Sequence, residues 1–265
     1  MVCLSRRLFS YDTGAEMSGA DWQSYLRTFH GQKPGVTEQV LSKVEGSPYA
    51  WLAEPLHDTA GWIVDVACGS APTRDHLPGH RWVGADLSSS ELTAALAAGR
   101  EPVVQARADA LPFVDGAADA VCAAMALQVV TPLPDVLAEI GRVLVPSGVL
   151  AALVPSRLGA SPQGLLGWTR MLGALGFASP RWPNPHACDR LAGLLSRHGF
   201  QIVATERRTF WFPVNTGDSA ALLVDSLYLP GISADRLASA KQKLGSWARP
   251  GRRLPLPLRR VIARH

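Results

Sequence analysis

The sequence predicts an α/β fold with a mostly parallel sheet and helices on both of its faces. Apolar segments with the composition of buried strands alternate with segments whose apolar residues have helical spacing. Such alternation builds right-handed strand–helix–strand units and therefore a parallel sheet covered on both faces. With 265 residues and 47% apolar content, the chain can bury one large core, and two domains of equal size are not expected.

Seven segments are predicted to be strands, and helices are expected between them. A capping box of Ser88 and Glu91 is expected to begin a helix that Gly99 ends. Further helices are expected at residues 131–144 and 188–198. The predicted strands are residues 63–66, 81–85, 102–108, 119–125, 149–154, 200–212 and 254–263.

Three segments lie outside the regular alternation. Residues 1–60 lack strand alternation and are predicted to form a helical cap that belongs to the same domain as residues 61–265. Insertions are expected at about residues 155–186 and 214–250. Because the second insertion separates the last two strands, these strands are interpreted as a hairpin that carries a lid.

Composition argues against several classes of protein. The four cysteines have no C-x-x-C spacing, so neither a disulfide framework nor a zinc site is predicted. His76 and His80 have helical spacing, but Pro78 and Gly79 break the helix that would align them on a metal. No apolar run has the length of a membrane span or a signal peptide, so we expect a cytoplasmic protein without a membrane partner.

The net charge of +4 does not by itself indicate a nucleic-acid partner. Much of the positive excess comes from arginines between residues 249 and 264, and no recognised nucleic-acid motif accompanies them. A small-molecule partner is therefore favoured over a nucleic acid.

Residues 63–73, I-V-D-V-A-C-G-S-A-P-T, join a buried strand to a bend of small residues. Ala67, Gly69, Ser70 and Ala71 allow the backbone to approach a ligand closely. At such a junction, free amides and the positive end of a helix face the crevice where open α/β sheets bind ligands. We interpret the stretch as a ligand-binding loop, although an ordinary strand-to-helix connection has the same pattern.

Acidic residues lie at or near the ends of three of the predicted strands. Asp65 lies just before the loop, Asp86 ends the second strand and Asp109 ends the third. All three are expected at the carboxyl edge of one sheet. A carboxylate at the position of Asp86 can accept two hydrogen bonds from the vicinal hydroxyls of a ribose.

The ordered motifs resemble those of the class I S-adenosylmethionine-dependent methyltransferases, especially the type-11 group, over residues 61–154. They are W-I-V-D-V-A-C-G-S-A, V-G-A-D-L-S-S-S-E-L, R-A-D-A-L-P-F-V-D-G, A-D-A-V-C-A-A-M-A-L-Q and L-A-E-I-G-R-V-L-V-P-S-G. Five motifs in order are far more specific than one glycine-rich loop. The resemblance implies a Rossmann-like, seven-stranded sheet, with S-adenosyl-L-methionine as methyl donor and S-adenosyl-L-homocysteine as product.

The resemblance also implies roles for residues at matching positions. Asp65 organises the loop, Asp86 holds the ribose, and Asp109 takes the exocyclic amino group of adenine. An aromatic residue of the N-terminal segment closes over the methionine end in many members. The implied cofactor-binding residues are Tyr11, Asp65, Ala67, Cys68, Gly69, Asp86, Leu87, Asp109, Ala110 and Met125.

The sequence departs from the family pattern at three positions. The usual loop has glycine where Ala67 and Ala71 stand, and the usual P-G-G has Ser147 at its centre. A side chain at positive φ is strained, so a strained loop that still binds its cofactor is expected. A dinucleotide site is also disfavoured, because a G-x-G-x-x-G pattern that starts at residue 67 would read Ala67, Gly69 and Pro72 and lose two of its three glycines.

No catalytic side chain is obligatory for this chemistry. A methyl group on a sulfonium is already electrophilic, so the protein needs mainly to align the acceptor and remove a proton where there is one. His30, beside Gly31 in the predicted cap, is the leading candidate base. Aromatic residues of the cap and the insertions are candidates to line an acceptor pocket: Tyr25, Trp51, Trp168 and Trp211.

These observations predict methylation of an O, N or C atom of a small, partly apolar molecule, with no metal. One alternative is a methyltransferase-like protein that binds the cofactor without transferring methyl, as a partner subunit or in other chemistry. Another is a nucleic-acid methyltransferase. The second alternative is disfavoured because residues 125–128 read M-A-L-Q where an N-P-P-[FY] motif would stand.

Overall fold

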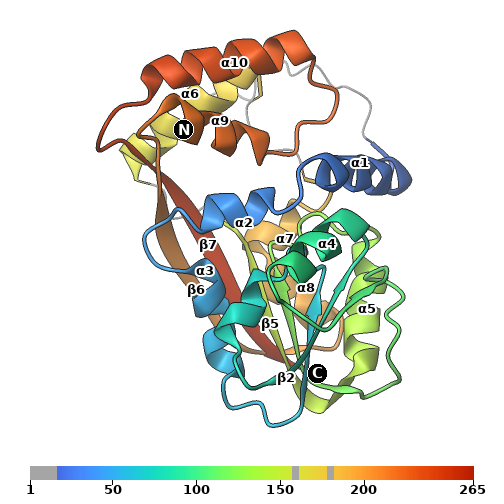
Figure 1. The fold of residues 1–265 in the computed structure, drawn as a ribbon. Helices are drawn as coiled ribbons and strands as arrows, with labels where there is room; N and C mark the ends of the chain where they lie inside the picture. The colour runs from blue at the N-terminus through green and yellow to red at the C-terminus, as the bar shows by residue number, and fades with distance from the viewer. Residues whose placement is uncertain (1–16, 157–160, 178–181) are drawn as a thin grey trace, which may run out of the picture.

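The structure is a computed structural model that describes residues 17–156, 161–177 and 182–265 (Figure 1). Tyr11, predicted to close over the cofactor, lies outside these ranges. In the described ranges, no helix is both long and apolar enough to cross a membrane.

A seven-stranded sheet forms the centre of the molecule, with the strand order β3-β2-β1-β4-β5-β7-β6. Its first five strands pair in parallel, whereas β7 is antiparallel to both β5 and β6. The predicted fold class and the late hairpin are therefore confirmed. The strands are β1 (Trp62–Val66), β2 (Arg81–Asp86), β3 (Val103–Gln105), β4 (Ala118–Ala124), β5 (Leu144–Pro155), β6 (Gln201–Pro213) and β7 (Arg253–Arg264).

The helices cover the sheet and extend beyond one end of it (Figure 1). Those before β1 are α1 (Gly19–Gln32), α2 (Val36–Leu41), α3 (Pro48–Ala53) and the 3-10 turn η1 (Glu54–Leu56). Those between strands are the 3-10 turn η2 (Pro72–His76), α4 (Ser89–Ala97), α5 (Leu133–Val143), α6 (Pro162–Leu175), α7 (His186–Asp189), α8 (Leu191–Arg197), α9 (Gly217–Asp225) and α10 (Ala234–Trp247). We call α6, α9 and α10 the lid, because they pack together at the top of Figure 1, beyond the β6–β7 ribbon.

Alternation along the strands divides the core into two clusters. Successive side chains of a strand point to opposite faces, so Ile63 joins one cluster and its neighbour Val64 joins the other. The second cluster packs under α5 and α8, and the first packs under α2, α3 and the lid. Both faces are apolar, as a parallel sheet requires.

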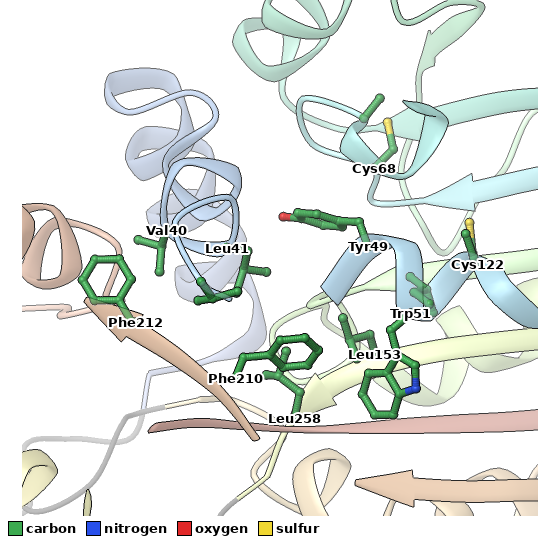
Figure 2. Close-up of a cluster of buried hydrophobic side chains, with 14 of the residues drawn as sticks. Val40, Leu41, Tyr49, Trp51, Cys68, Cys122, Leu153, Phe210, Phe212 and Leu258 are labelled. Carbon is green, nitrogen blue, oxygen red and sulfur yellow. The ribbon is translucent and has the colours of Figure 1, made fainter. Parts of the chain in front are cut away.

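The first cluster fixes α2 between the sheet and the lid (Figure 2). Val40 and Leu41 of α2 lie in one buried group with Phe210, Phe212 and Leu258 of the β6–β7 ribbon. Each such side chain contributes roughly 1.5–3 kcal/mol when it is fully buried. This packing places the first turn of α2 over the carboxyl edge of the sheet, where the candidate site lies.

Three predicted boundaries differ from the structure. The third strand covers only Val103–Gln105, because Ala106 to Ala110 turn back through an isolated bridge between Arg107 and Ala110. The fifth strand begins at Leu144 and runs through the predicted stop. The helix predicted at 188–198 is interrupted at Arg190, whose φ and ψ of −115° and 17° are not helical.

Ser147 has a φ of 66° within β5, at the position where the family pattern has glycine. Its side chain is exposed, so Ser147→Gly removes no buried contact. We expect this change to stabilise the fold by up to about 1 kcal/mol, because left-handed backbone costs a non-glycine residue about that much. The midpoint of urea unfolding measures the change.

Ser42→Gly is the matched control for that measurement. Ser42 is also exposed, but its φ of −76° is right-handed. Glycine at position 42 relieves no backbone strain and increases the entropy of the unfolded chain. The free energy of unfolding of the control should therefore fall by about 0.5–1 kcal/mol. A Ser147→Gly midpoint shifted downwards like that of the control would contradict the strain at Ser147.

Candidate functional site

The loop after β1 contains three residues in the left-handed region. They are Ala67, Gly69 and Ala71, with φ values of 54°, 56° and 56°. The expectation of strain at the two alanines is thus borne out by the backbone. A non-glycine residue tolerates this conformation only where its surroundings over-determine it, and such residues cluster at ligand sites.

Asp86 holds the loop in place from the end of β2. Its Oδ2 accepts a hydrogen bond of 2.8 Å from the N–H of Gly69, and its Oδ1 accepts one of 2.8 Å from the N–H of Ser88. Burial raises the pKa of Asp86, and these two N–H groups oppose part of that shift. The carboxylate therefore joins the loop to the start of α4 at the rim of a pocket.

Glu91 departs from its predicted role as the partner of Ser88 in a capping box. The Oγ of Ser88 does accept the N–H of Glu91, at 3.4 Å. The Glu91 carboxylate, however, turns to the N-terminal helices: its Oε1 lies 2.7 Å from Nδ1 of His30, and its Oε2 accepts the N–H of Gly35 at 2.9 Å. Glu91 thus joins α4 to α1 and to the start of α2.

Asp65 lies under the loop and is completely buried. Neither of its carboxyl oxygens has a hydrogen-bond partner of good geometry among the described residues. Burial raises its pKa to about 7, and the Cys122 thiol and the Thr73 hydroxyl oppose only part of this effect. The position of Asp65 beneath the loop agrees with an organising role, and it lines neither of the two pockets described below.

A first pocket, with a volume of about 160 Å³, opens above the loop at the carboxyl edge of the sheet. Seven of the predicted cofactor-binding residues line it: Ala67, Cys68, Gly69, Asp86, Leu87, Asp109 and Met125. Asp65 and Ala110 do not. Burial raises the pKa of the Cys68 thiol well above its usual value, so this sulfur remains protonated.

Acidic groups outnumber basic groups around the first pocket. Four carboxylates line it, from Glu38, Asp86, Glu91 and Asp109, against the guanidinium groups of Arg27 and Arg107. Two of the carboxylates are neutralised by arginine. Asp109 pairs with Arg107 at 2.5 Å, and Glu38 pairs with Arg100 at 2.7 Å. The sequence predicted that Asp109 binds the amino group of adenine, but it did not indicate Arg107. The Asp109 carboxylate would have to bind both the Arg107 guanidinium and the adenine.

A second pocket of about 360 Å³ lies between α2, the end of β5 and the lid. None of the described residues that line it is an Asp, Glu, Lys, Arg or His, and most are aliphatic or aromatic. Trp168, predicted to line an acceptor pocket, does so and donates its indole N–H to the carbonyl of Pro255 at 2.7 Å. This wall suits an uncharged ligand, because burying an unpaired charge is costly.

The two pockets meet at three residues that line both: Thr37, Met125 and Tyr228. Met125 directly follows β4 and has a φ of 56°, a conformation that a long side chain rarely adopts. The Gln128 side chain holds this backbone by donating to the Met125 carbonyl at 2.6 Å. The strained residue therefore stands where a ligand of one pocket would meet a ligand of the other.

Asn184 stabilises the turn that follows Met125. Its Nδ2 donates to the carbonyls of Leu127 and Val130 at 3.1 and 2.6 Å, and its backbone N–H donates to the carbonyl of Gln128 at 3.1 Å. Three hydrogen bonds from one residue far along the chain rigidify a segment that has no regular structure. The sequence carried no signal for this contact.

Three of the predicted acceptor-lining aromatics lie outside both pockets. Trp51 is buried in the first core cluster, beside Phe210 and under the guanidinium of Arg260. Trp211 lies against Arg253 on the β6–β7 ribbon. The hydroxyl of Tyr25 accepts the N–H of Leu229 at 2.7 Å, which anchors the segment after α9 to α1.

His30 lines the first pocket and contacts two groups that the sequence did not connect with it. Its Nδ1 faces Glu91, and its Nε2 lies 3.1 Å from the hydroxyl of Tyr228. Tyr228 is separated from His30 by 198 positions in the chain, so no local pattern could have indicated the contact. In the described part of the chain, no group of three or more His, Cys, Asp and Glu side chains is arranged to hold a metal ion.

The fold and the pocket define a class of protein. Five parallel strands, an antiparallel seventh strand inserted between β5 and β6, a small-residue loop after β1 and an acid at the end of β2 are the features of the class I S-adenosylmethionine-dependent methyltransferase fold. The family model described as "Methyltransferase domain" matches residues 64–152. Residues 64–152 thus match a methyltransferase domain, and the resemblance seen in the sequence is confirmed over this part of the chain.

Solved structures agree on the fold. A proposed methyltransferase from Bacillus halodurans C-125 is 19% identical over 83% of this chain and 99% of its own, with a TM-score of 0.57. The [4+2]-cyclase SpnF is 20% identical over 82% of this chain and 78% of its own, with a TM-score of 0.54. Geranyl diphosphate methyltransferase, in complex with GPP and sinefungin, is 14% identical over 92% of this chain and 98% of its own, with a TM-score of 0.50. No curated protein matches the sequence.

The residues of the first pocket fit S-adenosylmethionine, the cofactor of this family. A sulfonium and an ammonium group suit a pocket in which carboxylates outnumber arginines. The carboxylate of Asp86 lies where it could accept hydrogen bonds from the two ribose hydroxyls. Leu87, Ala108 and Met125 offer apolar contacts for the adenine ring. The individual contacts remain predictions.

Proposed function

We propose that this protein transfers a methyl group from S-adenosylmethionine to a small, partly apolar organic molecule. The observation that carries the proposal is the junction of the two pockets at Thr37, Met125 and Tyr228. Among the described residues, these three are where an acceptor in the second pocket would meet the first pocket. Holding two reactants in contact in this way is the main contribution that such a transfer needs from the protein.

The groups around the junction have separate tasks in this proposal. Bound S-adenosylmethionine supplies an electrophilic methyl group. Asp86 and the loop backbone orient the donor from the sheet, while Trp168, Leu172 and Leu258 exclude water from the acceptor. Excluding water matters because it prevents hydrolysis and strengthens the electrostatic interactions inside the site.

Supplying the purified protein with S-adenosylmethionine that carries a labelled methyl group, together with a cell metabolite extract, tests the proposal. Label in a small organic product supports it, and label in RNA supports a nucleic-acid methyltransferase instead. Label in neither fraction, with calorimetry showing that the cofactor binds, supports a cofactor-binding protein with other chemistry.

The last outcome has a structural argument of its own. Ala67 and Ala71 strain the loop at positions where the family pattern has glycine, and the fold is shared with a [4+2]-cyclase as well as with methyltransferases. The junction favours methyl transfer because it gives a donor and an acceptor separate pockets that touch.

Leu165→Trp should reduce methyl transfer at least about 10-fold while leaving the affinity for S-adenosylhomocysteine unchanged. Leu165 lines the second pocket from α6, and indole is much larger than the isobutyl group it replaces. The neighbouring Leu166 is 71% exposed and lines neither pocket, so Leu166→Trp is the matched control. Equal turnover in the two variants would show that the second pocket does not bind the acceptor.

A further inference from the structure

A chain of hydrogen bonds leads from α4 through α1 to the junction of the pockets. Glu91 Oε1 lies 2.7 Å from His30 Nδ1, and His30 Nε2 lies 3.1 Å from the Tyr228 hydroxyl. Glu91 is only 3% exposed and is fixed by the N–H of Gly35. Three ionisable side chains from distant parts of the sequence are thus held in one row.

The direction of each bond follows from the chemistry of the partners. A carboxylate can only accept, so His30 donates its Nδ1–H to Glu91. The same tautomer leaves Nε2 with a lone pair, which accepts the hydroxyl proton of Tyr228. The Thr37 hydroxyl lies close enough to the phenol to oppose part of the rise in its pKa, so it is placed to donate to the phenol oxygen. One lone pair of that oxygen is left for a further donor at the junction.

Burial raises the pKa of the Tyr228 phenol, and the negative charges of Glu91 and Asp86 reinforce the shift. Tyr228 therefore keeps a proton at neutral pH and cannot accept another without releasing its own. The titratable groups around it are Glu91 and Asp86 from the sheet side, and His30 and Tyr25 from α1. Of these groups, His30 is the one that directs an unprotonated nitrogen, Nε2, at the phenol hydroxyl.

We propose that the acceptor is an uncharged, largely apolar molecule that presents a hydroxyl group to Tyr228, and that Tyr228, His30 and Glu91 remove the proton of that hydroxyl. The proposal rests on the function proposed above. As the acceptor oxygen forms its bond to the methyl carbon, the carbon–sulfur bond breaks and its electron pair remains on sulfur. The acceptor proton moves to the Tyr228 oxygen, and the Tyr228 proton moves to His30 Nε2. The resulting imidazolium is stabilised by the carboxylate of Glu91.

The lining of the second pocket supports the chemical class of the acceptor. A phosphate or carboxylate would need arginine or lysine there, and an ammonium would be a buried charge without an acidic partner. The described lining residues include no charged side chain, and the polar groups nearest the first pocket are the hydroxyls of Thr37 and Tyr228. The polar contact that the junction offers an acceptor is therefore a hydrogen bond between a hydroxyl of the acceptor and a hydroxyl of Thr37 or Tyr228.

Tyr228→Phe and Tyr25→Phe form a matched pair that tests the relay. Both remove one phenol oxygen at the contact between α1 and the segment after α9, but Tyr25 lines neither pocket. With the acceptor found by labelling, Tyr228→Phe should reduce kcat about 100-fold or more, since positioned proton transfer typically contributes 10²–10⁴-fold. His30→Gln should reduce kcat to a similar extent. The kcat of Tyr25→Phe should remain within about 3-fold of the wild-type value. Equal pH–rate profiles for Tyr228→Phe and Tyr25→Phe would overturn the relay.

The tautomer of His30 provides a readout that does not depend on turnover. In ¹⁵N NMR spectra of the free protein, we expect Nδ1 protonated and Nε2 unprotonated at pH 8. Glu91→Gln should reduce this preference, because the amide can also donate. An Nε2-protonated ring in the wild type would contradict the relay even if methyl transfer occurs.

The labelled product tests the acceptor class and separates the two proposals. We expect the labelled product to enter ethyl acetate at both pH 3 and pH 10, and we expect its labelled methyl group to be bonded to oxygen. Label in a product that changes phase between these pH values, or on nitrogen or carbon, overturns this inference but leaves the methyltransferase in place. No labelled small molecule at all overturns the methyltransferase proposal and this inference with it.

Discussion

Asp86→Ala is expected to weaken the binding of S-adenosylhomocysteine about 10-fold or more. The carboxylate lines the first pocket at the end of β2, where a ribose diol would place two donors. Hydrogen bonds to a charged group contribute roughly 1.5–3 kcal/mol, which corresponds to about 10-fold to 100-fold in affinity. Isothermal titration calorimetry measures the change.

The same substitution should also destabilise the protein. Without the carboxylate, the N–H groups of Gly69 and Ser88 lose their partner, and each such buried group costs about 1–3 kcal/mol. Asp119→Ala separates the two effects, because Asp119 accepts the N–H of Trp62 at 2.9 Å at the opposite edge of the sheet. This control should lose stability without losing affinity. A folded Asp86→Ala variant with unchanged affinity would remove Asp86 from the cofactor site.

Asp65→Asn is expected to abolish a pH dependence of stability that the wild type shows between about pH 4 and pH 7. Because burial raises the pKa of Asp65 from 3.8 to about 7, the folded state binds this proton more tightly than the unfolded state does. The contribution of the group to stability is therefore complete below about pH 4 and is lost as the pH rises through about 7. Three pKa units correspond to at most about 4 kcal/mol.

Urea midpoints at pH 5 and pH 8 measure this effect. Asparagine has the same size as aspartate and no charge to desolvate. The stability of the variant relative to the wild type should therefore be highest at pH 8. Asp119→Asn serves as the control, because its carboxylate is exposed. A wild type and an Asp65→Asn variant that change in parallel between the two pH values would show that Asp65 titrates normally.

The sequence predicted the fold because local patterns determine it. Apolar runs marked the strands, and the acids at their ends marked the carboxyl edge, where Asp86 and Asp109 now line one pocket. The strain at Ala67, Ala71 and Ser147 was also predictable, since glycine at these positions is a requirement of backbone conformation.

The acceptor side was not predictable in the same way, because tertiary contacts build it. Aromatic residues suit both cores and pockets, so composition could not separate Trp168, which lines the second pocket, from Trp51, which lies in the core. Glu91 matched a capping pattern, and only the packing of α1 against α4 turned its carboxylate towards His30. The contact of His30 with Tyr228 likewise joins two residues 198 positions apart, which no local pattern predicts.

The β6–β7 ribbon makes the segment that contains α9 and α10 an excursion from a continuous framework. Phe212 pairs with Leu254 and Pro213 with Arg253, so the chain leaves the sheet and returns to it at adjacent points. A segment of another length and sequence can replace residues 214–252 without shifting the register of any strand pair or moving the loop after β1. Because this excursion supplies Tyr228 to both pockets, a grafted excursion that keeps a tyrosine at this place is a route to a new acceptor.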